Sequence, residues 1–266
     1  MRQYFCRALL FVLMLPVGLF AQESEGYSIG QRFHLETSFG DQGIKSDSPY
    51  WGDNVPPYKS YTGATKHPLP LEPVEGLAVE DAIRERRSVR SFVDAPIELT
   101  ELARLLLSGN GVTERRGDVD HRATPSAGAL YPIELYVVAR RVTDLPSGLY
   151  HFQPQDSTLV LIEAADFSRD IRMVANGQEW ISGAAATVFV TARFDRTTQK
   201  YADRGYRYVY MESGMVAENI CLQAVSLGLG TTTVGAFNDD AANELAGIDG
   251  VFEATLLLIP VGRGAK

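Results

Sequence analysis

The sequence predicts an α+β fold in which helices cover both faces of a central sheet. Apolar, β-branched runs typical of strands occur between segments of helical periodicity, and their order is mixed, not a strict βαβ repeat. The longest helical pattern is apolar on nearly every face, which places it in the middle of the fold. There is no internal repeat and no low-complexity tract.

The composition is that of an ordinary globular protein. Of the 266 residues, 45% are hydrophobic and 22% are charged, which excludes bulk disorder, a collagen-like chain and a coiled coil. The net charge of −8, with no basic block, argues against a nucleic-acid partner because phosphate backbones require a positive surface. The two cysteines, Cys6 and Cys221, are too few for a disulfide framework or a cysteine metal cluster.

Residues 1–21 have the pattern of a secretory signal peptide. Arg2 and Arg7 precede an uncharged apolar run, ALLFVLMLPVGLF, which is followed by Ala21. This run is shorter than the roughly 20 residues that span a bilayer, so we expect no stable membrane span after signal removal. The expected protein is therefore exported, either periplasmic or secreted. The alternative is an N-terminal anchor that is never cleaved.

Residues 22–76 are expected to form an extended N-terminal arm, and residues 77–266 the folded domain. The arm is rich in Gly, Pro, Ser, Tyr and Asp, and SPYWGDNVPPYKSY and HPLPLEP interrupt regular structure. Four aromatic residues suggest that the arm packs against the domain: Tyr50, Trp51, Tyr58 and Tyr61.

The periodicity of the domain predicts four helices. AVEDAIRERR places apolar residues on one face (Ala78, Val79, Ala82 and Ile83). ELTELARLLL follows and is expected to stop at the SGNG segment that begins at Ser108. Residues 207–227 form the long central pattern, in which Met215 is assigned to the core. Asn238 is suited to cap a short helix that ends at Ala246.

Strand signals fill the rest of the domain. Residues 133–139 (IELYVVA) and 184–191 (AAATVFVT) read as buried strands, and GLYHFQPQDSTLVLI reads as a hairpin that turns around residues 153–157. Further strands are expected at residues 231–237 (TTTVGAF) and 253–261.

The cluster Arg86-Arg87-Ser88-Val89-Arg90 is the first candidate for a binding site. The helix should end near Arg87, so that Ser88 and Arg90 share one face of an extended segment and Arg86 lies close by. Two guanidinium groups and a hydroxyl suit a single phosphate, because arginine offers paired donors to phosphate oxygens. The structural alternative is a solvated basic helix end, where cations also favour the helix dipole.

Three further segments could serve a ligand. TPSAGALYP (residues 124–132) has small residues between two prolines, which would let a flat ligand approach backbone N–H groups. Gly235-Ala236-Phe237 is a small-residue gap at a strand end, and Arg263 offers another cation. The alternative for residues 124–132 is a simple loop before a strand. The four histidines, at positions 34, 67, 121 and 151, have no metal-ligand spacing, so no metal site is expected.

Four motifs, taken in their order along the chain, resemble the FMN-dependent nitroreductase superfamily. They are RRSVRSF, PSAGALYPIELY, LGLGTTTVGAF and a terminal PVGR. Within the superfamily, HRATPSAGALYPIELYVVA, SGLYHFQP and the segment from KYADRGYRYVYMESG to GAFNDD resemble the SagB-type dehydrogenase branch, which includes azoline oxidases that form thiazoles and oxazoles in ribosomal peptides. The similarity covers about residues 77–263.

The resemblance implies a nitroreductase-like fold with a mixed, mostly antiparallel central sheet and a long central helix. It further implies a homodimer with two FMN sites at the subunit interface. Arg86, Ser88 and Arg90 would hold the FMN phosphate and ribityl chain, with Arg263 adding to the phosphate site. The remaining residues would lie at the flavin: Ser126, Gly128, Ala129 and Leu130 along the ring, from the partner subunit, and Gly235 and Ala236 near N5.

Lys200 and Tyr201, in QKYADRGYR, match a lysine–tyrosine pair of the azoline dehydrogenases. Azoline oxidation needs a base that takes a carbon-bound proton while hydride passes to the flavin, and either side chain could serve. Arg204 and Arg207 are expected on the same helical side as Lys200, at i+4 and i+7, where they could bind an acidic substrate. The alternative is that the pair belongs to a charged, solvated helix start.

The sequence therefore predicts an exported FMN-dependent oxidoreductase that transfers hydride between flavin N5 and a small or peptide-derived substrate. One alternative is an NAD(P)H-dependent nitro or quinone reductase, and another is a non-catalytic flavin-binding protein. No nucleic-acid partner and no metal cofactor are expected.

Overall fold

The computed structural model describes residues 28–38, 55–117 and 119–265. The chain divides into two compact units, Met1–Gly43 and Ile44–Lys266. In the first unit, helix α1 (Ile29–Glu36) begins with a capping box formed by Ser28 and Gln31. The predicted signal peptide lies outside the described residues, as do Tyr50 and Trp51 of the predicted arm.

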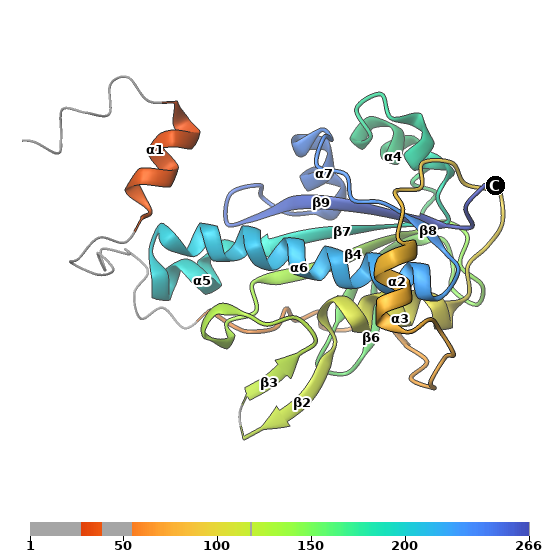
Figure 1. Ribbon diagram of the computed structural model, residues 1–266, viewed down its shortest axis with the longest axis horizontal. Helices are drawn as coiled ribbons and strands as arrows, with labels where there is room; N and C mark the ends of the chain where they lie inside the picture. The colour runs from red at the N-terminus through yellow and green to blue at the C-terminus, as the bar shows by residue number, and fades with distance from the viewer. Residues whose placement is uncertain (1–27, 39–54, 118, 266) are drawn as a thin grey trace, which may run out of the picture. The chain divides into compact units, whose positions relative to one another are not determined.

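A seven-stranded sheet forms the centre of the second unit (Figure 1). All its pairings between neighbouring strands of the described chain are antiparallel, which confirms the predicted α+β fold with a mostly antiparallel central sheet. In spatial order the strands are β1 (Lys66–Pro68), β6 (Thr158–Glu163), β5 (Gly148–Gln153), β4 (Ile133–Ala139), β7 (Ala186–Arg193), β9 (Glu253–Gly262) and β8 (Gly230–Thr231).

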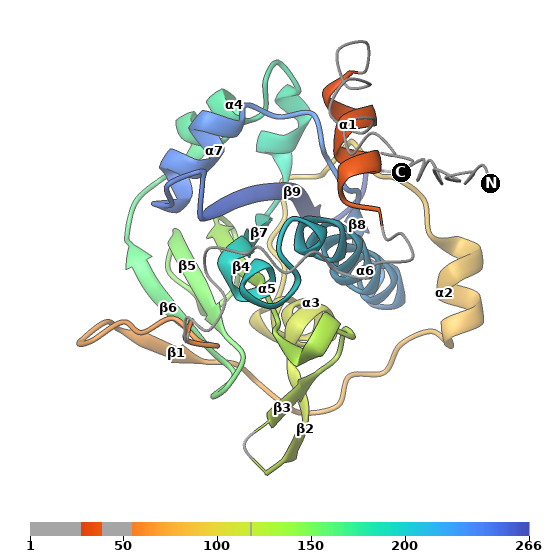
Figure 2. The same ribbon diagram turned by 90° about the vertical axis from the view of Figure 1, so that its left-hand side faces the viewer.

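Helices cover both faces of this sheet (Figures 1 and 2). Alternate residues of β4 point to opposite faces: Leu135 and Val137 join one hydrophobic cluster, Tyr136 and Val138 the other. The first cluster includes side chains of α3 (Leu99–Asn110) and α6 (Arg204–Ser226). The second includes side chains of α4 (Ser168–Val174) and α7 (Asp239–Ala246). All seven residues of β4 are buried, so this strand is central to the core.

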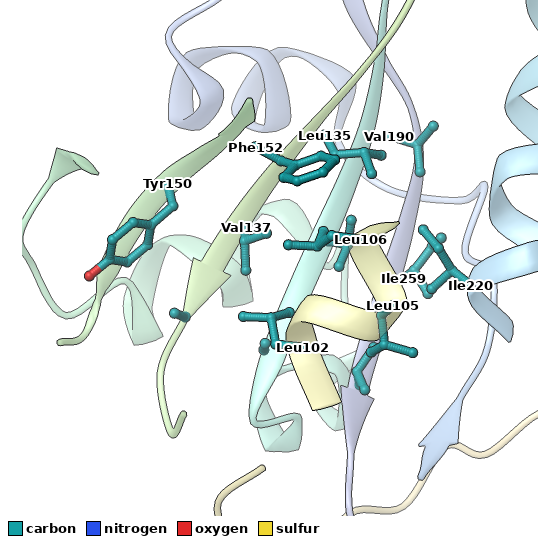
Figure 3. Close-up of a cluster of buried hydrophobic side chains, with 14 of the residues drawn as sticks. Leu102, Leu105, Leu106, Leu135, Val137, Tyr150, Phe152, Val190, Ile220 and Ile259 are labelled. Carbon is teal, nitrogen blue, oxygen red and sulfur yellow. The ribbon is translucent and has the colours of Figure 1, made fainter. Parts of the chain in front are cut away.

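The packing of α3 on α6 explains why α3 is longer than predicted (Figure 3). We expected a stop at Ser108, but the helix continues to Asn110 and ends at Gly111. A Cβ atom on Gly109 would lie 2.8 Å from Cγ1 of Ile220 on α6. Glycine is therefore used here for close helix–helix approach, and the prediction that it breaks the helix was wrong.

Helix α2 (Val79–Glu85) forms where predicted, but its apolar face is not buried. Ala82 is buried, whereas Val79 is 60% exposed and Ile83 is 59% exposed. Apart from Ala82, the apolar residues of this helix therefore do not pack into the core of the described chain.

The long helix α6 was predicted with nearly correct limits, and its environment only in part. Val209, Val216 and Ile220 are fully buried, as expected of a central helix. Met215, however, is 46% exposed, and Tyr210 and Met211 are also exposed, so the assignment of Met215 to the core was wrong. One side of α6 faces away from the sheet.

Most strand predictions are confirmed, including the hairpin of β5 and β6, and Asn238 caps α7 by accepting a hydrogen bond from the Ala241 N–H. The predicted strand at residues 231–237 is reduced to β8 and one bridge between Val234 and Leu258. The separate hairpin of β2 (Val112–Arg116) and β3 (Val119–Arg122) was not predicted, because its charged sequence lacks an apolar alternation.

Candidate functional site

The predicted phosphate-binding cluster lies beside β8. Helix α2 ends at Glu85, two residues earlier than predicted, and Arg86 leaves helical geometry. The segment that follows runs alongside β8: Ser88 forms a parallel bridge with Thr231, and the Val89 N–H donates to the Thr231 carbonyl at 3.0 Å. Ser88 and Arg90 are exposed. Within the described residues, neither Arg86 nor Arg90 has a carboxylate partner.

Arg90 and Ala236 lie on either side of the same short segment. The Arg90 guanidinium carbon is 5.9 Å from the ring centroid of Trp180, and Trp180 belongs to the 3-10 turn Glu179–Gly183. Just before this turn, the side-chain amide of Gln178 donates to the Ala236 carbonyl. Gly235 is exposed, and a Cβ atom there would meet only Leu257 Cδ2, at 3.9 Å. The structure thus places residues 86–90, here called the arginine segment, near the Gly235-Ala236 gap.

Arg263 lies beside the same segment, but its charge is already paired. Its carbonyl accepts a hydrogen bond from the Val93 N–H at 2.9 Å. Its guanidinium contacts Glu101 of α3, with 2.9 Å between Nη2 and Oε2. Of the predicted cations, Arg263 is therefore the one with a carboxylate partner.

The loop from Ser126 to Tyr131, here called the ring loop, has an unusual backbone. Gly128, Ala129 and Tyr131 have φ values of 67°, 55° and 47°. Left-handed conformations of non-glycine residues cost about 1–3 kcal/mol each and persist only where the surroundings impose them. Tyr131 is held in this way: its N–H donates to Ser126 Oγ at 2.8 Å and its carbonyl accepts from Arg196 at 3.1 Å.

The ring loop lies directly against the predicted catalytic pair. A Cβ atom on Gly128 would be 2.9 Å from the Tyr201 hydroxyl oxygen and 3.0 Å from Lys200 Nζ. A side chain at this position would force the ends of both groups to shift, and the left-handed φ of Gly128 also favours glycine. Two segments that were each predicted to be functional therefore meet in one protomer, although Gly128 and Lys200 are 72 residues apart in the sequence.

The helix that carries Lys200 is not continuous with α6. Helix α5 (Phe194–Tyr201) ends at Tyr201, and Ala202 has a φ of 47°. The expectation that Arg204 and Arg207 share a helical side with Lys200 was therefore wrong, because the break redirects the chain. Instead, Tyr201 makes an edge contact with Tyr208 of α6 at 5.0 Å between ring centroids, and the Lys200 ammonium lies 5.4 Å from the Tyr201 ring centroid.

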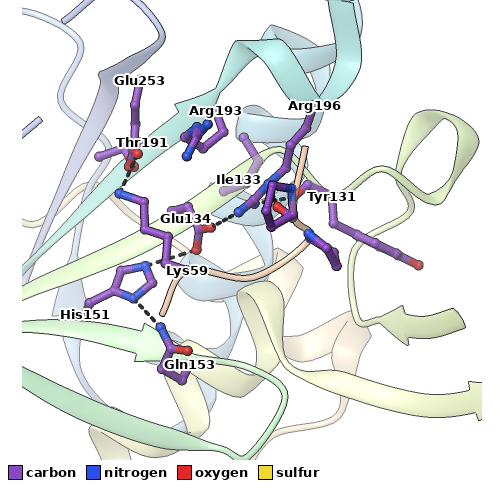
Figure 4. Close-up of polar contacts among 12 residues, drawn as sticks. Lys59, Tyr131, Ile133, Glu134, His151, Gln153, Thr191, Arg193, Arg196 and Glu253 are labelled. Atoms are coloured by element: carbon purple, nitrogen blue, oxygen red, sulfur yellow. Dashed lines mark hydrogen bonds and ion pairs between the residues drawn. The ribbon is translucent and has the colours of Figure 1, made fainter. Parts of the chain in front are cut away.

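A buried polar network next to the ring loop was not recognised from the sequence (Figure 4). Glu134 of β4 pairs with Arg196 at 2.7 Å and contacts His151 at 3.0 Å. Burial alone would raise the pKa of Glu134, but Arg196 and His151 lower it to about 2. A charged residue within an otherwise apolar strand is the sequence signal that could have indicated this network.

Residues 56–61 pack against the same buried polar network. Arg196 donates to the Pro56 carbonyl at 2.9 Å, Arg122 donates to the Pro57 carbonyl, and Lys59 pairs with Glu253 at 2.5 Å. Tyr61 packs on His151, with 5.3 Å between ring centroids. This part of the predicted arm thus lies on its own protomer.

The two predicted halves of the cofactor site lie at opposite ends of β7. Ala186 pairs with Val261, which pairs with Thr231, the residue bridged to Ser88. At the other end, the Arg193 N–H donates to the carbonyl of Pro132, next to the ring loop. Eight strand residues span about 23 Å. One protomer therefore keeps the arginine segment and the ring loop far apart.

Two other kinds of feature are absent from the described residues. No group of three or more His, Cys, Asp or Glu side chains is arranged to hold a metal ion. No helix is long and apolar enough to cross a membrane.

The helix-covered antiparallel sheet and the position of these segments define an α+β protein of nitroreductase-like architecture. The profile of the nitroreductase family matches residues 83–263, and the chain belongs to that family. It is therefore an oxidoreductase.

Individual relatives agree with this assignment. The nitroreductase-like protein MJ1384 of Methanocaldococcus jannaschii is 42% identical over 195 residues, which cover 73% of this chain and 96% of that protein. The microcin B17-processing protein McbC of Escherichia coli is 27% identical over 133 residues, about half of each chain (48% and 49%). A solved structure of a nitroreductase-like protein from Ralstonia eutropha is 26% identical with a TM-score of 0.65, and the match covers 80% of this chain and 95% of that chain.

Proposed function

We propose that this protein is an exported, homodimeric, FMN-dependent oxidoreductase of SagB type. It transfers hydride between flavin N5 and a small or peptide-derived substrate, and oxidation of an azoline-like ring fits the residues at the site. The contact of Gly128 with both Lys200 and Tyr201 carries this proposal, because it joins the proposed flavin-facing loop to a candidate base. The similarity to a microcin-processing protein supports the SagB-type assignment.

The residues present fit FMN. Arg86 and Arg90 are cations without a carboxylate partner in the described chain, and Ser88 is an exposed hydroxyl beside them. These are the donors that a phosphate group requires. Gly235 and Ala236 leave an open, small-residue edge, as a flat ring requires. When bound, FMN supplies the hydride chemistry at N5.

The ring loop completes the site from the partner subunit. The distance of about 23 Å along β7 separates the ring loop from the arginine segment within one protomer. A two-fold dimer brings the ring loop of one protomer to the arginine segment of the other. The exposed apolar side chains of α2 and α6, namely Val79, Ile83, Met211 and Met215, give such a dimer a surface to bury.

Lys200 and Tyr201 would act on the substrate proton. When an azoline ring loses hydride, a proton must also leave a neighbouring carbon, and either Lys200 Nζ or the Tyr201 oxygen is placed to accept it across Gly128. Arg204 stays with Tyr208, to whose hydroxyl its Nε donates at 3.2 Å.

A second function is favoured by a different observation. The similarity to MJ1384 extends over nearly the whole of that nitroreductase-like protein. This supports an NAD(P)H-dependent nitro or quinone reductase, in which Lys200 and Tyr201 bind the substrate and transfer no carbon-bound proton.

Anaerobic reduction of the flavin-loaded protein distinguishes the two functions. The SagB-type function predicts that a synthetic azoline peptide bleaches the flavin band, that Lys200→Ala and Tyr201→Phe slow this reduction, and that NADPH does not reduce the flavin. Rapid bleaching by NADPH, with no effect of the two variants, would establish the reductase instead.

The N-terminal pattern supports the proposed export. Residues 1–21 would be removed as a signal, and residues 22–76 would form the arm, whose strand β1 pairs with the sheet of the flavin domain of residues 77–266. Edman sequencing of the protein recovered from the extracellular or periplasmic fraction tests this order, and an uncleaved, cytoplasmic protein would contradict it.

A further inference from the structure

Arg196 is a buried arginine that the proposed mechanism does not use. It lies in the first turn of α5, one helical turn before Lys200, and is only 1% exposed. A buried cation loses its hydration and destabilises the fold unless close partners compensate for that loss. The role of Arg196 therefore depends on the groups that its guanidinium contacts.

Three nitrogen atoms of this guanidinium contact three different segments of the chain. Nη1 donates to the Tyr131 carbonyl at 3.1 Å, at the end of the ring loop, and Nε donates to the Pro56 carbonyl at 2.9 Å, in the arm. Nη2 lies 2.7 Å from Oε1 of Glu134 on β4 (Figure 4). One side chain carried by α5 thus joins the ring loop, the arm and the central strand.

The Tyr131 carbonyl is the point at which Arg196 reaches the proposed site. Tyr131, with its φ of 47°, follows Gly128 by three residues. Lys200 follows Arg196 by four residues on α5, and residues four apart lie on the same face of a helix. The hydrogen bond from Arg196 to Tyr131 therefore ties the helix that carries Lys200 to the loop that carries Gly128, close to the place where the two meet.

Glu134 keeps the guanidinium in this orientation. While one carboxylate oxygen faces Arg196, the other lies 3.0 Å from Nε2 of His151, whose Nδ1 is 2.7 Å from the side-chain nitrogen of Gln153. Burial acts to raise the pKa of Glu134, but Arg196 and His151 lower it to about 2. The carboxylate is therefore ionised at neutral pH and is held from both sides.

We propose that Arg196 is a positioning residue, which holds the ring loop against α5 and so places Lys200 and Tyr201 beside Gly128. This inference rests on the proposed function, because the pair is assigned to the substrate proton there. A guanidinium suits the role, since its donors point in fixed directions from three nitrogen atoms, whereas a lysine ammonium is a single point charge on a flexible stem.

Two variants remove the guanidinium without leaving a buried charge unpaired. Arg196→Lys keeps a cation for Glu134 but not the three directed contacts. The double variant Arg196→Met with Glu134→Gln removes both charges together. Arg193→Lys is the matched control, because the Arg193 guanidinium pairs with Asp195 at 2.5 Å and its backbone N–H still donates to the Pro132 carbonyl. Urea unfolding establishes that each variant is folded.

The first readout is hydrogen exchange of the ring loop in protein without flavin. The amides of Ala129 and Tyr131 donate to the carbonyl and the hydroxyl of Ser126, so their exchange reports how firmly the loop is held. We expect the peptide that contains them to exchange about tenfold faster than wild type in Arg196→Lys and in the double variant, and at the wild-type rate in Arg193→Lys. Wild-type protection in either folded Arg196 variant would overturn the positioning role.

The second readout tests whether Arg196 acts through the catalytic pair. A positioning residue loses its effect once the groups that it positions are removed. We expect Arg196→Lys to slow reduction of the bound flavin by a synthetic azoline peptide about tenfold, but by less than about twofold when Lys200→Ala and Tyr201→Phe are already present. Equal slowing in both backgrounds would overturn the proposal. If the peptide does not reduce the wild-type flavin but the exchange pattern is observed, the proposed function alone fails.

Discussion

Gly128 is the residue on which the proposed site depends most closely. Its left-handed backbone favours glycine, and a Cβ atom there would displace the Tyr201 hydroxyl and Lys200 Nζ. Ala129 and Tyr131, which follow it in the ring loop, are held in strained conformations by backbone and side-chain hydrogen bonds. Strain of this kind is concentrated where a protein positions reacting groups.

Gly128→Ala should reduce both stability and activity. The positive φ alone costs roughly 1 kcal/mol, and the contacts of 2.9 and 3.0 Å would displace Tyr201 and Lys200. Urea unfolding and turnover of the flavin-loaded protein measure the two effects. Gly63→Ala is the control: its φ is 74°, but no atom lies within 4 Å of the added Cβ. It should show the stability loss with full activity, and equal activity losses in the two variants would contradict the account.

The chemistry of individual side chains could be read from the sequence, whereas their burial and their partners in the fold could not. Arginines beside a serine, and small residues between two prolines, could be read from the sequence because their chemistry is local. The burial of Glu134, His151 and Arg196 could not, because it depends on which strand or helix covers each residue. The pairing of Arg263 with Glu101 was equally hidden, since it joins residues 162 positions apart.

At the scale of secondary-structure elements, long segments with a regular periodicity could be predicted from the sequence. Very short strands and the break between two consecutive helices could not. Strand β4 and helix α6 have clear patterns over many residues, and both formed where expected. Strand β8 is only two residues long, because the chain beyond Thr231 makes a single bridge to β9 instead of a continuous ladder. The break at Ala202 divides one apparent helix into α5 and α6, and an alanine gives no signal for a left-handed residue.

Helix α2 should contribute to the dimer interface. Val79 and Ile83 form an apolar pair one turn apart that its own protomer leaves exposed. The double variant Val79→Ser and Ile83→Ser should weaken self-association at least tenfold, as measured by sedimentation velocity over a concentration series. Met173→Ser on α4, a side chain that is also exposed, should leave association unchanged. A double variant as dimeric as wild type would remove α2 from the interface.

At the scale of the whole molecule, we propose that the site belongs to two chains. The arginine segment and the ring loop occupy opposite ends of β7, which supports a site completed by a partner subunit. The resemblance in the sequence suggested this sharing, and the strand register now gives it a physical reason. The net charge of −8 gave no indication of the proposed phosphate site, because the arginines of that site are confined to one short segment.

Subunit mixing tests the shared site. Protomers with Arg86→Ala and Arg90→Ala, and protomers with Lys200→Ala and Gly128→Val, should each form inactive dimers. Mixed dimers contain one site built from two unaltered halves, so exchange between the two populations should restore about a quarter of wild-type activity. Activity that stays at background after confirmed exchange would show that each site is built within one chain.

The absorbance spectrum of the purified protein, before and after addition of FMN, tests whether the protein binds this cofactor. We predict a flavin band with one FMN bound per protomer, lost when Arg86 and Arg90 are replaced together by alanine in protein that remains folded. A colourless wild-type protein that does not bind added FMN would contradict it.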